Sequence, residues 1–240
     1  MDLRRLLLDG FEAAVAAADP LQVLAPALPD AASIRRVRRT LAVGAGKAAA
    51  SMAMALERHW PADAPLDGLV VTRYAHGLPC TRIEVIEAGH PVPDEAGERA
   101  AARILERATA LGEEDLLVAL VSGGGSSLLS LPVDSVPMDD LKAVTRSLLA
   151  SGAPIQDMNV VRKHLSQIQG GRLAQRTRAR VLALMISDVA GDDPSSIASG
   201  PCSPDPSTYA DALAILARWR VATPASVREH LERGARGLVD

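Results

Sequence analysis

Aromatic side chains are almost absent from this sequence of 240 residues, which has two tryptophans, two tyrosines and one phenylalanine. Proteins that bind single-stranded nucleic acid stack the bases on such side chains, so the sequence offers no platform for that kind of recognition. The formal net charge of −3 gives no overall positive field of the kind that attracts nucleic acid or an anionic membrane surface. We therefore expect neither as a partner.

Cysteines and long apolar runs are also scarce. Cys80 and Cys202 lack the spacing of a metal site or a CxxC redox motif, so we expect free thiols in a reducing cytoplasm. No apolar run approaches the roughly 20 residues of a membrane span. Asp9 and Glu12 interrupt the N-terminal apolar segment, which argues against a signal peptide. The expected location is cytoplasmic.

Lysine is rarer still, because arginine supplies all but three of the 26 basic residues. The three lysines are Lys47, Lys142 and Lys163. A lysine retained in such an arginine-rich chain indicates a role that a guanidinium group cannot fill.

Apolar residues make up 48% of the chain and charged residues 23%, as in an ordinary globular protein. Short, continuously apolar runs alternate with segments of helical periodicity. This pattern predicts an α/β fold, a Rossmann-like, mostly parallel sheet with helices on both faces, built as one domain over residues 1–240. The expected strands are 41–43, 68–72, 83–88, 116–121 and 181–186, and the main expected helices are 2–18, 48–60, 95–111, 138–150, 156–169, 207–219 and 225–233.

The most informative segment is LLVALVSGGGSSLLSL, residues 116–131, in which a strand leads into three glycines and a serine-rich helix start. Backbone N–H groups at a helix N-terminus bind anions, and the helix dipole favours negative charge there. We interpret this segment as a seat for phosphate; the alternative is a glycine-rich turn that only reverses the chain. The seat consists of Ser122, Gly123, Gly124, Gly125, Ser126 and Ser127.

The first expected strand runs into GAGKAA, residues 44–49, which fits the permissive dinucleotide pattern G-x-G-x-x-G/A. The acidic residue that such a site needs about 20 positions later is missing, although Arg73 suits a 2′-phosphate and keeps NADP open. Gly46 and Lys47 are better explained by an anionic substrate or a transferring phosphoryl group; the alternative is a solvated lysine. Neither glycine loop is a Walker P-loop.

The fifth expected strand delivers Asp188 into a loop that also carries Asp192 and Asp193. Carboxylate oxygens at a strand end that faces a phosphate seat are suitable ligands for Mg²⁺. We select Asp188 and Asp193 as metal ligands, and Asp188 is alternatively a base acting on a hydroxyl. The competing interpretation is that Asp192 and Asp193 cap turns around Pro194.

Ligands bind beyond the carboxyl ends of the strands in an open α/β sheet, so the three polar loops should converge on one crevice. Asn159 and Lys163 lie four residues apart and therefore on one face of an expected helix, from which they can reach this crevice as substrate-binding residues. Each also suits a surface position. Arg162 and His164 lie on the same helix and could also reach the crevice, although we expect a structural role for His164.

Five segments in order resemble the glycerate 2-kinases, some of which are labelled hydroxypyruvate reductases. They are VGAGKAAASMA, GHPVPDEAG, LVSGGGSSLLSLP, MNVVRKHLSQIQGGRLA and SDVAGDDPSSIASGPCSPDP. The resemblance implies transfer of the γ-phosphoryl group of ATP to the 2-hydroxyl of D-glycerate, with Mg²⁺, in a cleft between two domains. It also implies that Lys47 is an active-site residue. From the electrostatics of the expected crevice we select Lys47 and Asp188 as the catalytic residues.

Members of this family continue into a smaller C-terminal domain, named for its MOFRL motif, that supplies further active-site residues including an arginine. This chain ends at Asp240, so it resembles the N-terminal domain alone, and we expect half of the cleft and little kinase activity. The open half-cleft also suits a homodimer. The rival hypotheses are an NADP-dependent hydroxypyruvate reductase, which has no need of the SGGGSS and SDVAGDD loops, and a non-catalytic nucleotide-binding fragment.

Overall fold

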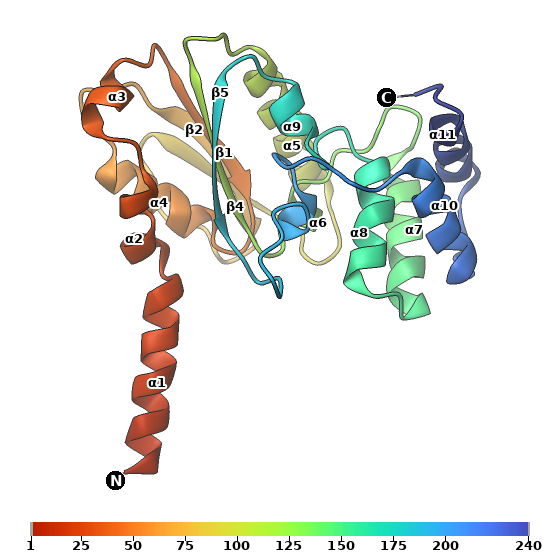
Figure 1. The fold of residues 1–240 in the computed structure, drawn as a ribbon, viewed down its shortest axis with the longest axis horizontal. Coiled ribbons are helices and arrows are strands. Elements are labelled where there is room, and N and C mark those ends of the chain that lie inside the picture. Colours follow the sequence, from red (N-terminus) through yellow and green to blue (C-terminus); the bar gives the residue numbers. More distant parts are fainter. Residues whose placement is uncertain (1, 240) are drawn as a thin grey trace.

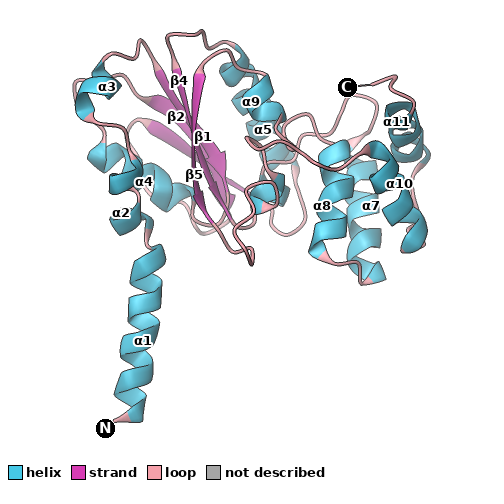
Figure 2. Cartoon of the chain, in the orientation of Figure 1, coloured by secondary structure: helices cyan, strands magenta, loops and turns pink. Residues whose placement is uncertain are grey.

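The computed structural model describes residues 2–239 and contains a five-stranded, all-parallel sheet with strand order β3-β2-β1-β4-β5. Helices cover both faces of the sheet (Figures 1 and 2), so the α/β fold expected from the sequence is confirmed. The strands are β1 (Thr40–Ala45), β2 (Asp67–Arg73), β3 (Ile83–Ala88), β4 (Leu116–Ser122) and β5 (Arg180–Ile186). All five overlap the expected strands.

The two central strands explain why the apolar runs are continuous. Every residue of β1 and β4 is buried, because side chains on both sides of these strands face a layer of helices. One layer packs around Met52 and Leu56 of α4, and the other around Ile104 of α5. The edge strand β5 is only partly buried.

The longer helices follow the sequence pattern closely, and short helical turns connect them. Asp94 caps α5 by accepting a hydrogen bond from the N–H of Gly97, and Gly152 ends α7 in the left-handed conformation. The helices are α1 (Leu3–Ala18), α2 (Pro20–Val23), η1 (Ala25–Ala27), α3 (Ala31–Arg35), α4 (Ala49–His59), α5 (Glu95–Thr109), α6 (Gly125–Leu128), α7 (Met138–Ser151), α8 (Ile155–His164), α9 (Arg172–Gln175), η2 (Ile197–Ser199), α10 (Tyr209–Arg218) and α11 (Ala225–Ala235).

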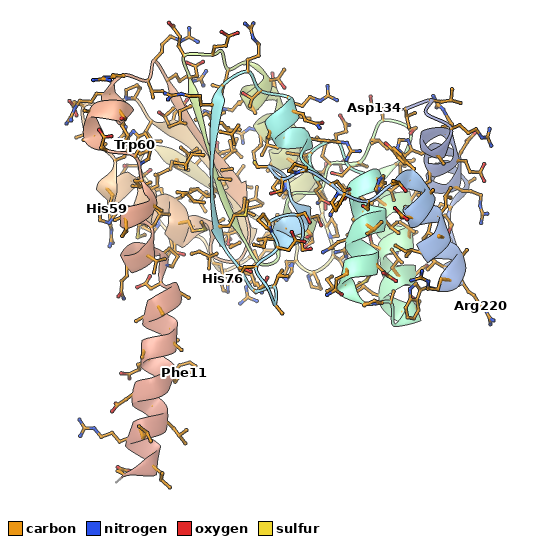
Figure 3. All side chains as sticks on the ribbon, in the orientation of Figure 1. Phe11, His59, Trp60, His76, Asp134 and Arg220 are labelled. Atoms are coloured by element: carbon orange, nitrogen blue, oxygen red, sulfur yellow. The ribbon has the colours of Figure 1, made fainter. Side chains whose placement is uncertain are left out.

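Helix α1 projects away from the rest of the molecule (Figure 1), and none of its residues is buried. Apolar side chains are therefore exposed along it, among them Phe11, which points into open space (Figure 3). Over residues 2–239, no helix combines the length and the apolar character that crossing a membrane requires.

A second hydrophobic core lies outside the sheet, in a helical unit formed by α7, α8, α10 and α11 (Figure 2). Leu148, Leu165, Val227 and Leu231 are fully buried within it. The unit combines two separate stretches of chain, one before and one after β5, and the sequence pattern did not reveal this arrangement.

The helix expected over 156–169 is shorter in the structure, and this part of the prediction is wrong. Helix α8 ends at His164, after which the hydroxyl of Ser166 accepts hydrogen bonds from the N–H groups of Ile168 and Gln169. Ser166 also forms an isolated bridge with Pro132. Side-chain capping of this kind competes with the helical hydrogen bonds and stops the helix.

Candidate functional site

The strand order reverses direction between β1 and β4, which is where an open α/β sheet forms a ligand-binding crevice. Lys47 follows β1, the glycine triplet follows the neighbouring β4, and Asp188 follows β5. The ammonium of Lys47 lies 3.1 Å from Oδ2 of Asp188. The expected convergence of the three polar loops is therefore confirmed.

The turn after β1 is tightly tied to its surroundings. The N–H of Lys47 donates to the carbonyl of Gly123 at 2.8 Å, and the N–H of Ala48 donates to the hydroxyl of Ser122 at 3.0 Å. Gly46 has a positive φ of 144°, and a Cβ there would lie 2.1 Å from the Ser122 hydroxyl oxygen. Its own N–H donates to Val71, and that of Ala49 donates back to Gly46. The N–H groups of the turn that leads into α4, from Gly46 to Ala49, are thus occupied by protein acceptors.

The turn after β4 differs in this respect. The N–H groups of Gly124, Gly125 and Ser126 make no hydrogen bond to a neighbouring segment of the described chain. The helix that follows, α6, is a single turn, so its dipole is weaker than the sequence argument assumed. The absence of protein acceptors for these N–H groups within residues 2–239, rather than the dipole, makes this turn suitable for an anion.

Asp188 and Asp193, the two expected metal ligands, lie in different surroundings. The carboxylate of Asp193 accepts hydrogen bonds from the hydroxyls of Ser195 and Ser196, which lower the pKa of Asp193 and match the turn-capping alternative. Among residues 2–239, no three side chains of the metal-binding types cluster closely enough to hold an ion. Asp188 alone of the pair faces the crevice.

The helical unit supplies the opposite wall of the crevice through α8. Asn159 is 7% exposed and its Oδ1 has no hydrogen-bond partner in the described chain. Arg162, one turn later on the same face, also faces the crevice, and burial lowers the pKa of Arg162. Lys163 points elsewhere, because its buried ammonium pairs with Asp205 at 3.2 Å.

His90 lies at the start of the loop after β3, and its Nδ1 is 2.7 Å from the hydroxyl of Ser127. Burial lowers the pKa of His90, and the positive charges of Lys47, Arg73 and Arg162 lower it further. The imidazole is therefore neutral at pH 7, and together with Ser127 it adds polar atoms beside the glycine turn.

These walls enclose a pocket of about 260 Å³. It is lined by Lys47, His90, Pro91, Gly124, Ser126, Ser127, Leu149, Ile155, Gln156, Asn159, Arg162, Asp188, Val189, Ser196 and Ala198.

Six of the residues selected from the sequence line this pocket, namely Lys47, Gly124, Ser126, Ser127, Asn159 and Asp188. Four more, Gly46, Ser122, Gly123 and Gly125, form the closely packed turns beneath it. Arg162, His90 and Ser196 also line the pocket, although none of them was selected from the sequence as a site residue. The helical spacing could have indicated Arg162, because it lies three positions after Asn159 and residues three apart share a helix face as residues four apart do.

The chain is similar in sequence and in fold to several known proteins. The model of a domain of unknown function, DUF4147, matches residues 6–232. A provisionally named hydroxypyruvate reductase of Agrobacterium vitis is 52% identical over 96% of this chain and 52% of its own length. The glycerate 2-kinase of Pyrococcus horikoshii is 41% identical over 100% of this chain and 56% of its own.

The crystal structure of the glycerate kinase of Thermotoga maritima superposes with a TM-score of 0.83 at 40% identity, covering 95% of this chain and 55% of that one. The chain spans about half the length of the relatives it matches. The resemblance to glycerate 2-kinases noted from the five sequence segments is confirmed, and the family match over residues 6–232 shows that the chain belongs to the DUF4147 family.

Proposed function

We propose that this chain forms one half of the active site of a glycerate 2-kinase, which transfers the γ-phosphoryl group of ATP to the 2-hydroxyl of D-glycerate. The observation that carries the proposal is the juxtaposition of Lys47, Asp188 and the glycine turn at one switch point of the sheet. The 41% identity to a named glycerate 2-kinase supports the same reaction. Because the chain spans half of such relatives, the remaining half of the site comes from outside these residues.

Phosphoryl transfer needs little covalent chemistry from a protein, so positioning and charge stabilisation account for most of the catalysis. In our proposal, the N–H groups of Gly124 and Ser126, which line the pocket and have no acceptor in the described chain, bind phosphate oxygens. The Lys47 ammonium offsets the negative charge that develops on the transferring group. Asp188 accepts the proton of the attacking hydroxyl. The hydroxyl oxygen of the substrate then forms a bond to the γ-phosphorus as the bond from that phosphorus to ADP breaks and ADP departs.

The donor set of the pocket also agrees with Mg²⁺ bound together with a nucleotide. Mg²⁺ usually binds one or two carboxylates together with substrate phosphates and retains several waters, and Asp188 is the one carboxylate among the described lining residues. If Asp188 holds the ion, it does so in place of acting as the base, and the charge of the ion would neutralise the phosphate oxygens. Asp193 does not line this pocket, and its hydrogen bonds with Ser195 and Ser196 engage both carboxylate oxygens.

An NADP-dependent hydroxypyruvate reductase is the second candidate, since two relatives from Agrobacterium vitis are named hydroxypyruvate reductases. A dinucleotide pyrophosphate binds the free N–H groups at the start of the first helix. In this chain the N–H groups of Gly46, Lys47, Ala48 and Ala49 already donate to protein acceptors. This observation favours the kinase over the reductase.

A coupled assay with ATP, Mg²⁺ and D-glycerate tests the proposal, using the chain alone and the chain mixed with the C-terminal half of the Pyrococcus horikoshii relative. We expect turnover only in the mixture, with 2-phosphoglycerate identified by ³¹P NMR. Oxidation of NADPH by hydroxypyruvate without ATP binding would reverse the assignment. ATP binding without turnover in the mixture would indicate a non-catalytic nucleotide-binding fragment.

A further inference from the structure

Arg162 stands out among the arginines of the described chain, because its half-buried guanidinium makes no hydrogen bond or ion pair with residues 2–239. An arginine is charged at every physiological pH, and enclosing such a charge without a partner is unfavourable. The half-buried guanidinium of Arg172, by contrast, donates to the carbonyls of Lys163 and Gln169. Arg162 therefore presents unused donors to the pocket.

Asn159 provides a second, independent unmet group on the same helix face. Its Oδ1 is buried and receives no hydrogen bond from the described chain. The residue is 7% exposed and lines the pocket. Buried amide oxygens are normally hydrogen-bonded, so this atom awaits a donor from a ligand. Arg162 offers donors and Asn159 an acceptor, which together match an anion that also carries a hydroxyl group.

The charged side chains that line the pocket indicate how many negative charges a bound ligand should carry. Lys47 and Asp188 neutralise each other, and both side chains are about half exposed, at 46% and 53%. Among the described lining residues this leaves Arg162 as the one uncompensated charge, because burial keeps His90 neutral. A single half-buried guanidinium without a partner suits one carboxylate, which a guanidinium can bind through two parallel hydrogen bonds.

The size of the pocket favours the small acid over the nucleotide. Its volume of about 260 Å³ lies below the roughly 300–1,000 Å³ typical for drug-sized ligands. A three-carbon acid fits inside, whereas most of a nucleotide must extend beyond the exposed Lys47–Asp188 pair.

We propose that Arg162 binds the carboxylate of the hydroxy-acid substrate and that Asn159 accepts a hydrogen bond from one of its hydroxyls. This inference rests on the proposed function and assigns the residue that makes the pocket select acids over uncharged polyols. The substrate then lies with its carboxylate toward α8 and its hydroxyls toward Ser126, Ser127 and the Lys47–Asp188 pair.

Calorimetric titration of the chain without ATP tests this assignment, with D-glycerate, D-glyceramide and inorganic phosphate as probes. We expect D-glycerate to bind and the amide to bind at least tenfold more weakly. Arg162→Gln should weaken D-glycerate binding at least tenfold and leave amide binding unchanged. The D-glycerate affinity of Arg162→Lys should lie between those of Arg162→Gln and the unaltered chain, because lysine keeps the charge but lacks the planar pair of N–H donors. Arg146→Gln, at an exposed position on α7, is the charge-matched control and should bind D-glycerate normally.

The melting temperature of unliganded Arg162→Gln should equal or exceed that of the unaltered chain, because the change removes an unpaired charge. Unchanged D-glycerate affinity in this variant overturns the inference, as does a loss of phosphate binding equal to the loss of D-glycerate binding. If the unaltered chain fails to bind D-glycerate, the inference fails, whereas the proposed kinase is judged separately by turnover in the mixture with the second half. If D-glycerate binding depends on Arg162 but no ATP-dependent turnover is found, only the kinase is lost.

Discussion

The carboxylate of Asp188 lies directly against the backbone of Gly123, so closely that a Cβ on Gly123 would be 1.9 Å from Oδ2 of Asp188. The first glycine of the triplet therefore has a packing role that its sequence context did not indicate. It leaves space for the side chain that pairs with Lys47. The position of the proposed base thus depends on the absence of a methyl group on a different loop.

Gly123→Ala should displace the Asp188 carboxylate and separate it from Lys47. Misplacement of a catalytic group by about 1 Å costs on the order of 100-fold in rate, and we expect a loss of at least that size in the coupled kinase assay. A crystal structure of the variant would show the moved carboxylate. Gly10→Ala, where a Cβ meets nothing within 4 Å, serves as the control. Normal turnover with Asp188 in place would contradict the packing role.

Lys47→Ala should abolish most turnover while leaving the fold intact. The Lys47–Asp188 pair is about half exposed, so its removal should change the free energy of unfolding by only about 0–1 kcal/mol. Loss of a group that stabilises transition-state charge costs roughly 100- to 1,000-fold in rate. Denaturant unfolding and kinase assays on the same preparation measure both effects, with Lys142→Ala as control. A rate within threefold of the unaltered protein would remove Lys47 from the mechanism.

The sheet and the loops at its carboxyl edge could be predicted because their signals are local. Continuous apolar runs indicated buried parallel strands, and glycines with charged residues after β1, β4 and β5 indicated a crevice. Lys47 and Asp188 were found in this way although they are 141 positions apart in the sequence.

The wall formed by α8 could not be predicted, because helical spacing alone fits several choices of face. Asn159 with Lys163 and Asn159 with Arg162 are equally compatible with one side of a helix. The choice depends on Asp205, which lies 42 positions beyond Lys163 and draws its ammonium away from the pocket. Long-range packing of this kind leaves no trace in the periodicity of a single helix.

Lys163→Met should destabilise the protein without acting through the site. The change leaves the buried carboxylate of Asp205 without its partner, and such a loss typically costs about 3–5 kcal/mol. Burial raises the pKa of Asp205, but hydrogen bonds from Ser207 and the charge of Lys163 more than offset this effect, so the pKa lies below its usual value. Denaturant unfolding measures the loss, with Lys142→Met as control.

Under conditions where Lys163→Met is still folded, its affinity for D-glycerate should match that of the unaltered chain. A loss of affinity for D-glycerate without a loss of stability would instead show that Lys163 is a substrate-binding residue, as predicted from the sequence.

The buried histidines of the helical unit should make the protein less stable as the pH falls below about 6.5. His164 donates from Nδ1 to the carbonyl of Val160, and His230 donates from Nε2 to the carbonyl of His164. Burial lowers the pKa of both side chains in the folded protein, and positive charges nearby, including that of Arg172, add to this effect. Both rings are thus harder to protonate in the folded protein than in the unfolded chain.

In the unfolded chain the pKa of a histidine returns to about 6.5. Below that pH the unfolded state binds more protons than the folded state, so the free energy of unfolding decreases as the pH falls. Unfolding by urea at pH 7.5 and 5.5 measures the difference, since most carboxylates stay ionised over this interval. His230→Gln lowers stability at both pH values but should shrink the difference between them, and an unchanged difference would show that His230 titrates normally in the folded protein.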